Sequence, residues 1–261
     1  MGRIKKAFEK PAFIGYMVTG DPDMERSKIV ASAMIEGGAD IIEVGIPFSD
    51  PVADGPVIQR ADTRALSAGT VPSSAFEITR DIRRYSEVPV VIFTYINPVI
   101  KAGFDSFYAC AKESGADAML IVDMPFEEAD EALAAAGKHG LDQIFLVSIT
   151  TSGERMKKIA EKASGFVYLI SALGTTGQRD KIPDKALELV ARSKEIFDIP
   201  VVVGFGISGP ENAKKLIDSG ADGVVVGSAI ISAVGDNIDS AEGIRDSVRD
   251  LVSDIKSGID P

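Results

Sequence analysis

Eight apolar runs recur along the chain, and a segment with helical spacing of apolar residues follows each of them. Three runs begin in closely similar sequences, GGADIIEVG at 37–45, SGADAMLIVD at 114–123 and SGADGVVVGS at 219–228, and KHGLDQIFLV at 138–147 is a weaker copy. In each copy a glycine follows the helical segment, as expected for the left-handed residue that ends many helices. The runs are apolar at consecutive positions, which predicts strands buried on both faces of a parallel, helix-covered sheet.

This alternation predicts an α/β fold. Eight strand-helix units in a chain of 261 residues match the size of a (β/α)8 TIM barrel. A doubly wound open sheet is the alternative, but its first turn usually reads GxGxxG, and here that turn is VTGDPDME. We expect one barrel domain over 1–261, with a short N-terminal helix. The expected strands are 12–18, 40–45, 89–95, 118–122, 143–147, 166–170, 200–204 and 223–227. The expected main helices are 24–37, 72–85, 105–114, 127–139, 153–163, 184–197, 210–219 and 240–257.

Two connections are longer than is usual in α/β units. One covers 46–71 after the second strand, and the other covers 171–183 after the sixth. Both follow the carboxyl ends of strands, where barrel enzymes build their active sites. We expect long loops that act as lids, with simple surface excursions as the alternative.

Composition narrows the possible partners. The 28 basic and 39 acidic side chains give a net charge of −11, and no basic cluster exceeds two residues, which excludes an electrostatic nucleic-acid surface. The lone Cys110, expected in the core, excludes an internal disulfide and fits a reducing compartment. The lone His139 excludes a metal site built on several histidines. With no targeting segment and no membrane-length apolar run, we expect a cytoplasmic protein.

Three carboxylates are candidates for chemistry. Glu43 lies inside a strand that should be buried, where an unpartnered carboxylate is costly, and near the catalytic end of that strand. A structural ion pair is the alternative. Asp54 lies in the turn-rich sequence PFSDPVADGP, where it either acts on a substrate or organises the turn. Asp123 ends the fourth strand and either lines the pocket or caps loop amides.

Glycines follow the last three strands, in GTTG at 174–177, GFGIS at 204–208 and VGSAI at 226–230. Barrels often bind phosphate there, with the amides of a short helix N-terminus and close approach at glycine. Ser228 adds a hydroxyl donor. These turns favour a phosphorylated ligand, and compact turns without a ligand are the alternative.

Aromatic side chains, and the lack of strand lysines and of a histidine cluster, define the rest of the expected site. Tyr16, Tyr95, Tyr168 and Phe205 lie at or after strand ends, where a flat apolar substrate fits. The expected strands carry no lysine and the chain has no histidine cluster, which argues against Schiff-base and zinc aldolases. A bond-cleaving barrel of this kind would work with carboxylates and hydrogen bonds alone.

Several of these segments together closely resemble the tryptophan synthase alpha chain family, over essentially the whole chain. They are GYMVTGDP (15–22), ADIIEVGIPFSDPVADGPVIQ (39–59), the GTTG loop, GFGIS and VVVGSAI (224–230). The resemblance implies cleavage of indole-3-glycerol phosphate into indole and glyceraldehyde 3-phosphate. It also implies a beta chain partner that receives the indole, in an α2β2 heterotetramer. Pyridoxal phosphate is then expected only on the beta chain, with no cofactor or metal on this chain.

The resemblance also implies residue roles. Glu43 and Asp54 match the family's catalytic carboxylates, and Tyr168 matches its active-site tyrosine. The matched substrate-binding residues are Tyr16, Tyr95, Leu120, Gly177, Phe205, Gly206, Gly227 and Ser228. Many family members have Arg and Val in the loop after the sixth strand, where this chain has Ala172 and Thr175, so the family account of loop closure does not transfer.

Two other functions remain open from the sequence. An isomerase of a phosphoribosyl substrate needs one acid and one base on separate strands, and Asp21 and Asp123 meet that need. It would also need two phosphate sites, whereas only one glycine cluster is present. A non-catalytic subunit that activates a beta chain is the other possibility, although the retained Glu43 and Asp54 argue against it.

Overall fold

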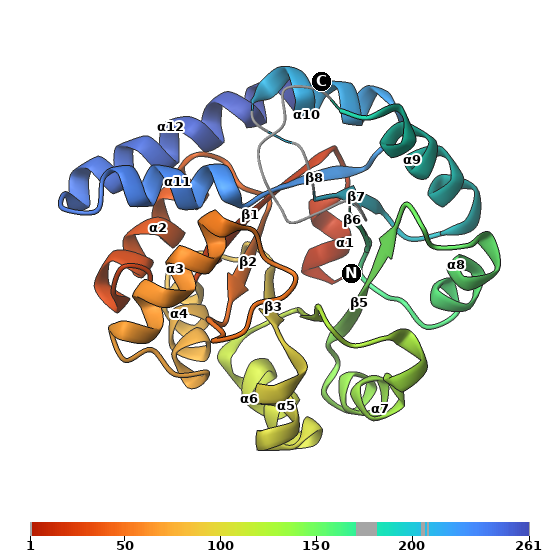
Figure 1. Ribbon diagram of the computed structural model, residues 1–261, viewed down its shortest axis with the longest axis horizontal. Coiled ribbons are helices and arrows are strands. Elements are labelled where there is room, and N and C mark those ends of the chain that lie inside the picture. The colour runs from red at the N-terminus through yellow and green to blue at the C-terminus, as the bar shows by residue number, and fades with distance from the viewer. Residues whose placement is uncertain (1, 171–181, 205–206, 208, 261) are drawn as a thin grey trace.

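The computed structural model describes residues 2–170, 182–204, 207 and 209–260, and its centre is a closed barrel of parallel strands (Figure 1). The strands pair in chain order and the eighth pairs with the first, so the sheet has no open edge. The strands are β1 (Ala12–Val18), β2 (Ile41–Gly45), β3 (Val90–Thr94), β4 (Ala118–Ile121), β5 (Asp142–Ser148), β6 (Val167–Ile170), β7 (Val201–Val203) and β8 (Gly223–Val226). Each end lies within one residue of its expected position, which confirms the TIM barrel.

Helices follow the strands and surround the barrel (Figure 1). They are α1 (Arg3–Ala7), α2 (Met24–Glu36), α3 (Pro56–Ser67), α4 (Ser73–Arg83), α5 (Ile96–Ala102), α6 (Phe104–Ser114), the 3-10 turn η1 (Phe126–Glu128), α7 (Asp130–His139), α8 (Gly153–Ala160), α9 (Asp184–Ile196), α10 (Pro210–Asp218), α11 (Ser228–Asp236) and α12 (Ala241–Ile259). In the part of the chain that is described, no helix combines the length and the apolar character needed to cross a membrane.

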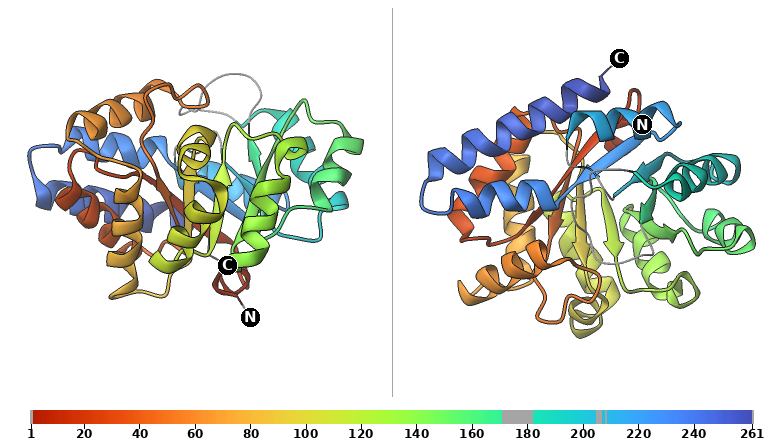
Figure 2. Two further views of the ribbon diagram at one scale, coloured as in Figure 1. Left: turned by 90° about the horizontal axis from the view of Figure 1, so that it is seen from below. Right: turned by 45° about the horizontal axis from the view of Figure 1, so that its top comes forward.

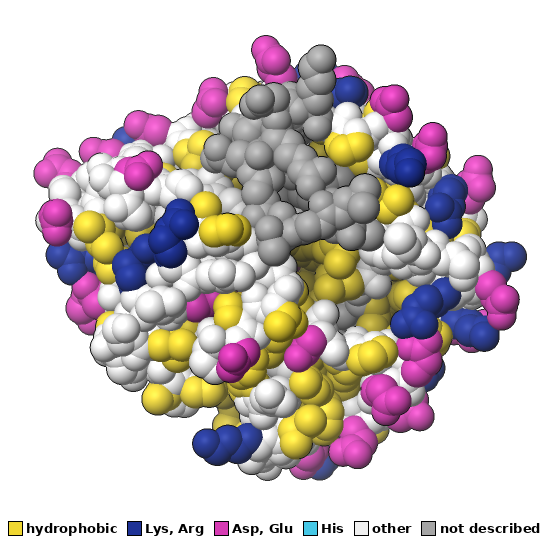
Figure 3. Space-filling model, in the orientation of Figure 1, with side chains coloured by type: hydrophobic (Ala, Val, Ile, Leu, Met, Phe, Trp, Pro, Cys, Tyr) yellow, Lys and Arg dark blue, Asp and Glu magenta, His cyan; other side chains and the backbone are white. Residues whose placement is uncertain are grey.

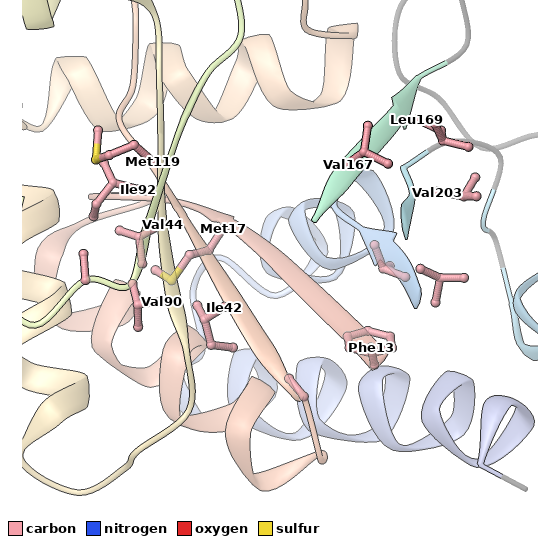
Figure 4. Packing of buried hydrophobic residues seen from close by; sticks show 14 of the residues in the cluster. Phe13, Met17, Ile42, Val44, Val90, Ile92, Met119, Val167, Leu169 and Val203 are labelled. Atoms are coloured by element: carbon pink, nitrogen blue, oxygen red, sulfur yellow. The ribbon is translucent and has the colours of Figure 1, made fainter. Parts of the chain in front are cut away.

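Successive strand residues alternate between two apolar layers. On β1, Ile14 and Tyr16 belong to the cluster inside the barrel, whereas Phe13 and Met17 belong to the layer between strands and helices. Figure 4 shows part of this outer layer, with side chains from several neighbouring strands packed together. Because both faces of each strand are buried, the strands read as continuous apolar runs.

The repeated Gly-Ala-Asp sequence tightens the amino-terminal end of the barrel. Asp40, Asp117 and Asp222 each accept a hydrogen bond from an amide near the start of the preceding strand, at 2.8, 3.0 and 2.7 Å. Each carboxylate also pairs with a cation, namely Lys256, Arg83 and Lys194 respectively. The glycine two residues before each aspartate has a φ between +96° and +101°, a conformation that favours glycine. The repeat therefore encodes the helix end and the strand anchor together.

The N-terminal helix closes this same end. Ile4 of α1 is buried within the interior cluster, and the ring of Phe8 lies 5.7 Å from that of Phe166. Figure 2 (left) shows α1 at the end of the barrel opposite α3. Only the carboxyl end of the barrel is therefore left for a ligand to enter.

Three helices were not expected. The 46–71 connection is not one long loop, because α3 occupies Pro56–Ser67 and leaves 46–55 as the irregular part. Its signals are Pro56 at the first helical position and the buried Ile58, Ala61 and Ala65 at helical spacing. Helices α5 and α11 are likewise additional.

The expectation that Cys110 lies in the core is wrong. Cys110 is exposed on α6, because the buried face of that helix is made by Phe107, Tyr108 and Ala111. The expected loop after β6 falls almost entirely on 171–181, outside the described residues.

We expect Asp117→Ala to lower the free energy of unfolding by about 3 kcal/mol, because it leaves the nearly buried Arg83 unpaired and the Val90 amide without its carboxylate. Urea denaturation measures the loss. The control is Asp81→Ala, whose partner Arg84 is largely exposed, and we expect it to cost about 0–1 kcal/mol. Equal effects of the two variants would contradict the anchoring role of Asp117.

Candidate active site

Glu43 is a carboxyl group enclosed within the barrel. It lies on β2 in register with Tyr16 of β1 and Val91 of β3, and it is completely buried. Neither carboxyl oxygen has a hydrogen-bond partner among the described residues. Burial disfavours the charged form and raises the pKa of Glu43 to about 8. At neutral pH the group is therefore a neutral acid poised to give up a proton.

Asp54 lies at the end of the irregular segment 46–55 and is also buried. The Tyr95 hydroxyl donates to Asp54 Oδ2 at 2.7 Å, and the same hydroxyl accepts the amide N–H of Ala53 at 3.0 Å. Burial raises the pKa of Asp54 to about 6, and the Tyr95 hydrogen bond opposes that rise. At neutral pH Asp54 is therefore mainly a carboxylate.

Local contacts fix the segment that carries Asp54. The Asp54 amide donates to Pro51 O at 3.0 Å, which forms a tight turn, and Gln59 Nε2 donates to Asp54 O at 2.8 Å. At the start of the segment, the Phe48 ring stacks on Tyr95 with centroids 4.8 Å apart. Tyr95 thus holds the segment at two points, a role for its hydroxyl that the sequence did not suggest.

Tyr16, Leu120 and Tyr168 belong to the apolar cluster inside the barrel, as expected of residues that line a ring-binding pocket. Glycines make room for the two tyrosines. A Cβ at Gly45 would lie 2.6 Å from Tyr16 Oη, and one at Gly204 would lie 2.2 Å from Tyr168 Cε1. Burial raises the pKa of the Tyr168 hydroxyl, and the nearby Glu43 and Asp54 carboxyls raise it further.

Gly227 and Ser228 lie where α11 begins. Gly227 is the N-cap residue and Ser228 is the first residue of the helix. The free amides and the dipole at a helix N-terminus attract anions. The other three expected ligand residues, Gly177, Phe205 and Gly206, lie outside the described residues.

The two carboxylates that the isomerase hypothesis would use as acid and base, Asp21 and Asp123, are bonded to other groups of the protein. Asp21 forms a two-point ion pair with Arg64, with N–O distances of 2.7 and 2.8 Å. Asp123 accepts the amide N–H of Ile96 at 2.7 Å, at the start of α5. Asp123 therefore caps an amide of α5, which follows β3, and not the amides of its own loop after β4, as the alternative from the sequence expected.

One buried acid was missed. Asp62 of α3 is 4% exposed, and its Oδ2 has no hydrogen-bond partner among the described residues. Burial, followed by the nearby Asp54 charge, raises the pKa of Asp62 to about 8. The residue escapes notice in the sequence because its burial depends on α3. Among the described residues, no three His, Cys, Asp or Glu side chains are grouped to hold a metal ion.

Comparison with known proteins identifies the family. The family model for the tryptophan synthase alpha chain matches residues 3–260. The chain belongs to the tryptophan synthase alpha chain family. The alpha chain of Methanoregula boonei is 50% identical over 259 residues, covering 98% of both chains. That of Methanothermobacter thermautotrophicus is 44% identical over 246 residues, covering 94% of this chain and 91% of the relative.

Solved structures agree with this assignment. A tryptophan synthase from Mycobacterium tuberculosis superposes with a TM-score of 0.91 at 36% identity, covering 100% of this chain and 99% of the other. The tryptophan synthase complex from Pyrococcus furiosus gives 0.87 at 39% identity, covering 95% and 98%. The tryptophan synthase alpha chain family implies a lyase-type reaction in tryptophan biosynthesis, and it works with a beta chain. Neither the isomerase nor the non-catalytic subunit is favoured.

We expect Tyr95→Phe to raise the pKa of Asp54, which is about 6 in the wild type, by roughly one pH unit. The Tyr95 hydrogen bond stabilises the carboxylate form of Asp54, and the variant lacks that bond. Carbon-13 NMR titration of aspartate-labelled protein measures the change. The matched control is Tyr108→Phe, whose hydroxyl bonds Gln143. An unchanged Asp54 titration in Tyr95→Phe would show that the hydrogen bond does not control its charge.

Glu43→Gln should also change how stability depends on pH. The unfolded chain releases the Glu43 proton near pH 4.5, whereas the folded chain holds it to about pH 8, so the wild type loses stability as pH rises between these values. The stability of the variant relative to wild type should therefore rise by about 3 kcal/mol from pH 5 to pH 8. Urea denaturation at both pH values, with the exposed Glu131→Gln as control, tests this. Parallel curves for wild type and Glu43→Gln would contradict the raised pKa.

Proposed function

We propose that this chain cleaves indole-3-glycerol phosphate into indole and glyceraldehyde 3-phosphate. The observation that carries the proposal is the Glu43 carboxyl, completely buried without a hydrogen-bond partner among the described residues. A group in this state suits proton transfer at neutral pH, because its pKa of about 8 lies near the working pH. Membership of the tryptophan synthase alpha chain family supports this choice of substrate.

Glu43 acts first as an acid and then as a base. It gives a proton to indole C3, which leaves the positive charge on the ring nitrogen. It then takes the proton of the side-chain hydroxyl as the carbon–carbon bond breaks. The bonding electrons return to the ring, which leaves as indole, and the hydroxyl carbon becomes the aldehyde of glyceraldehyde 3-phosphate. One proton is given and one is taken, so Glu43 ends as it began.

Asp54 stabilises the charge that develops on the ring. Its carboxylate accepts the indole N–H hydrogen bond, which strengthens as the nitrogen becomes cationic. Because Tyr95 already fixes Asp54 Oδ2, little reorganisation is needed when the charge appears. Tyr168, a neutral phenol near both carboxyls, completes the catalytic group.

The remaining roles follow the same division of the pocket. Tyr16, Tyr95, Leu120 and Phe205 surround the indole ring. The phosphate is held by Gly177, Gly206, Gly227 and Ser228, with support from the α11 N-terminus. This chain needs no cofactor or metal of its own for these steps.

The chain passes indole to a tryptophan synthase beta chain, which carries pyridoxal phosphate, in a cytoplasmic α2β2 heterotetramer. Support comes from apolar side chains at the carboxyl end of the barrel. Val52 of the irregular segment is 80% exposed and Ile100 of α5 is 60% exposed. Figure 3 shows apolar side chains gathered on the face that carries these elements. Such a patch fits a partner surface.

We expect purified chain to release indole from indole-3-glycerol phosphate, and Glu43→Gln to lower kcat by about 10²- to 10⁴-fold, because the amide cannot transfer a proton. The assay is run with and without a tryptophan synthase beta chain. The pH profile of kcat/KM should rise as Asp54 ionises near pH 6 and fall as Glu43 ionises near pH 8.

Glu131→Gln, an exposed change on α7, serves as the matched control and should keep full activity. Full activity in a folded Glu43→Gln protein would overturn the role of Glu43. No indole from wild type, even with a beta chain, would overturn the proposed reaction.

A further inference from the structure

Gln59 is an exposed residue of α3 whose side chain reaches back past the start of its own helix. Its Nε2 donates to the backbone carbonyl oxygen of Asp54 at 2.8 Å, and Asp54 lies just before the N-cap residue Gly55. A capping side chain accepts hydrogen bonds from the free amides of a helix. The Gln59 amide donates to a carbonyl instead, so the needs of the helix start do not explain this bond. It joins α3 to Asp54.

Helix α3 is held firmly against the barrel. Its residues Ile58, Ala61 and Ala65 belong to the apolar cluster inside the barrel. Arg64 of the same helix forms a two-point ion pair with the buried Asp21, which follows β1, at N–O distances of 2.7 and 2.8 Å. The helix is therefore a rigid support, and a side chain on it can fix the position of a neighbouring segment.

The described hydrogen bonds hold Asp54 at its amide, its carboxylate and its carbonyl. The amide N–H donates to Pro51 O at 3.0 Å, within the irregular segment 46–55. Oδ2 accepts the Tyr95 hydroxyl at 2.7 Å, from the N-cap residue of α5. The carbonyl accepts Gln59 Nε2, from α3. The side chain and the backbone of Asp54 are thus tied to different elements outside the segment.

We propose that Gln59 is a positioning residue for Asp54, because its amide fixes the Asp54 carbonyl and with it the backbone from which the carboxylate extends. The inference rests on the proposed function, in which the Asp54 carboxylate accepts the indole N–H. A carboxylate that stabilises a developing charge must already be in place when the charge appears. Tyr95 fixes one carboxylate oxygen, and Gln59 fixes the other end of the residue. Together the two bonds determine the orientation of the carboxylate.

The test compares Gln59→Met with Gln59→Lys in the indole-release assay. Met has a similar length but no donor, so we expect kcat and kcat/KM to fall together by about 10-fold, because a displaced catalytic group mainly weakens the transition state. Lys retains an N–H donor on a long side chain and should recover most of the loss. The matched control is Thr63→Val, which removes an exposed hydrogen bond to the Gln59 carbonyl within α3 and should keep full activity.

Stability and a double mutant separate positioning from damage to the helix. Because Gln59 is exposed, the midpoint of urea denaturation should be the same in Gln59→Met and wild type. If Gln59 acts through Asp54, then Asp54→Ala combined with Gln59→Met should be as active as Asp54→Ala alone. A further 10-fold loss in the double mutant would overturn the proposal. So would a Gln59→Lys protein as impaired as Gln59→Met, or a lowered urea midpoint in Gln59→Met but not in Thr63→Val.

A measurement without substrate keeps the inference separate from the proposed reaction. Carbon-13 NMR should give an Asp54 pKa of about 6 in wild type and in Thr63→Val, and a lower pKa in Gln59→Met, because water reaches the carboxylate of a loosened segment. An unchanged Asp54 titration in a folded Gln59→Met protein would overturn the positioning role. Absence of indole release from wild type would overturn the reaction instead, while the titration still decides whether Gln59 holds Asp54.

Discussion

The closed ring of strand hydrogen bonds isolates the interior of the barrel from water, and the chemistry of the site depends on that isolation. At one end, α1 and the Phe8–Phe166 contact fill the opening, and the three repeated aspartates fix the strand starts. A polar group on the inner face of β2 can therefore be reached only from the carboxyl end. Glu43 occupies such a position, and because no other described residue bonds its carboxyl, a molecule that enters there can hydrogen-bond to it.

The two principal carboxyls owe their different behaviour to the elements that carry them. Glu43 is on a strand inside the ring, where desolvation alone sets a pKa of about 8. Asp54 is on an irregular segment at the rim, where a phenol hydroxyl supports its charge and the pKa is about 6. Separated pKa values of this kind assign the neutral group to proton transfer and the charged group to electrostatic stabilisation. The barrel provides both environments within one pocket.

The strands were predictable because a strand that is buried on both faces has apolar residues at consecutive positions. The same rule exposed Glu43, since a carboxylate within such a run is conspicuous. Helix α3 was missed because the turn-forming residues before Pro56 dominate the local signal, and α5 and α11 follow strands without a capping side chain. Asp62 was missed as a buried acid because its burial depends on α3. The Tyr95 hydrogen bond joins residues 41 positions apart, a separation that no local pattern encodes.

The charge states of the buried acids are consistent with the substrate that we propose. Among the described residues, four buried acids surround the carboxyl end of the barrel, and of these four Asp21 alone has a described cation, Arg64, as its partner. Were the other three all ionised, their combined field would repel a phosphorylated molecule from the mouth. Because burial keeps Glu43 and Asp62 neutral near pH 7, Asp54 is the one of these three acids that carries a negative charge. A ligand with an anionic phosphate at one end and a developing cation at the other matches that distribution, with the α11 N-terminus and Asp54 as the respective complements.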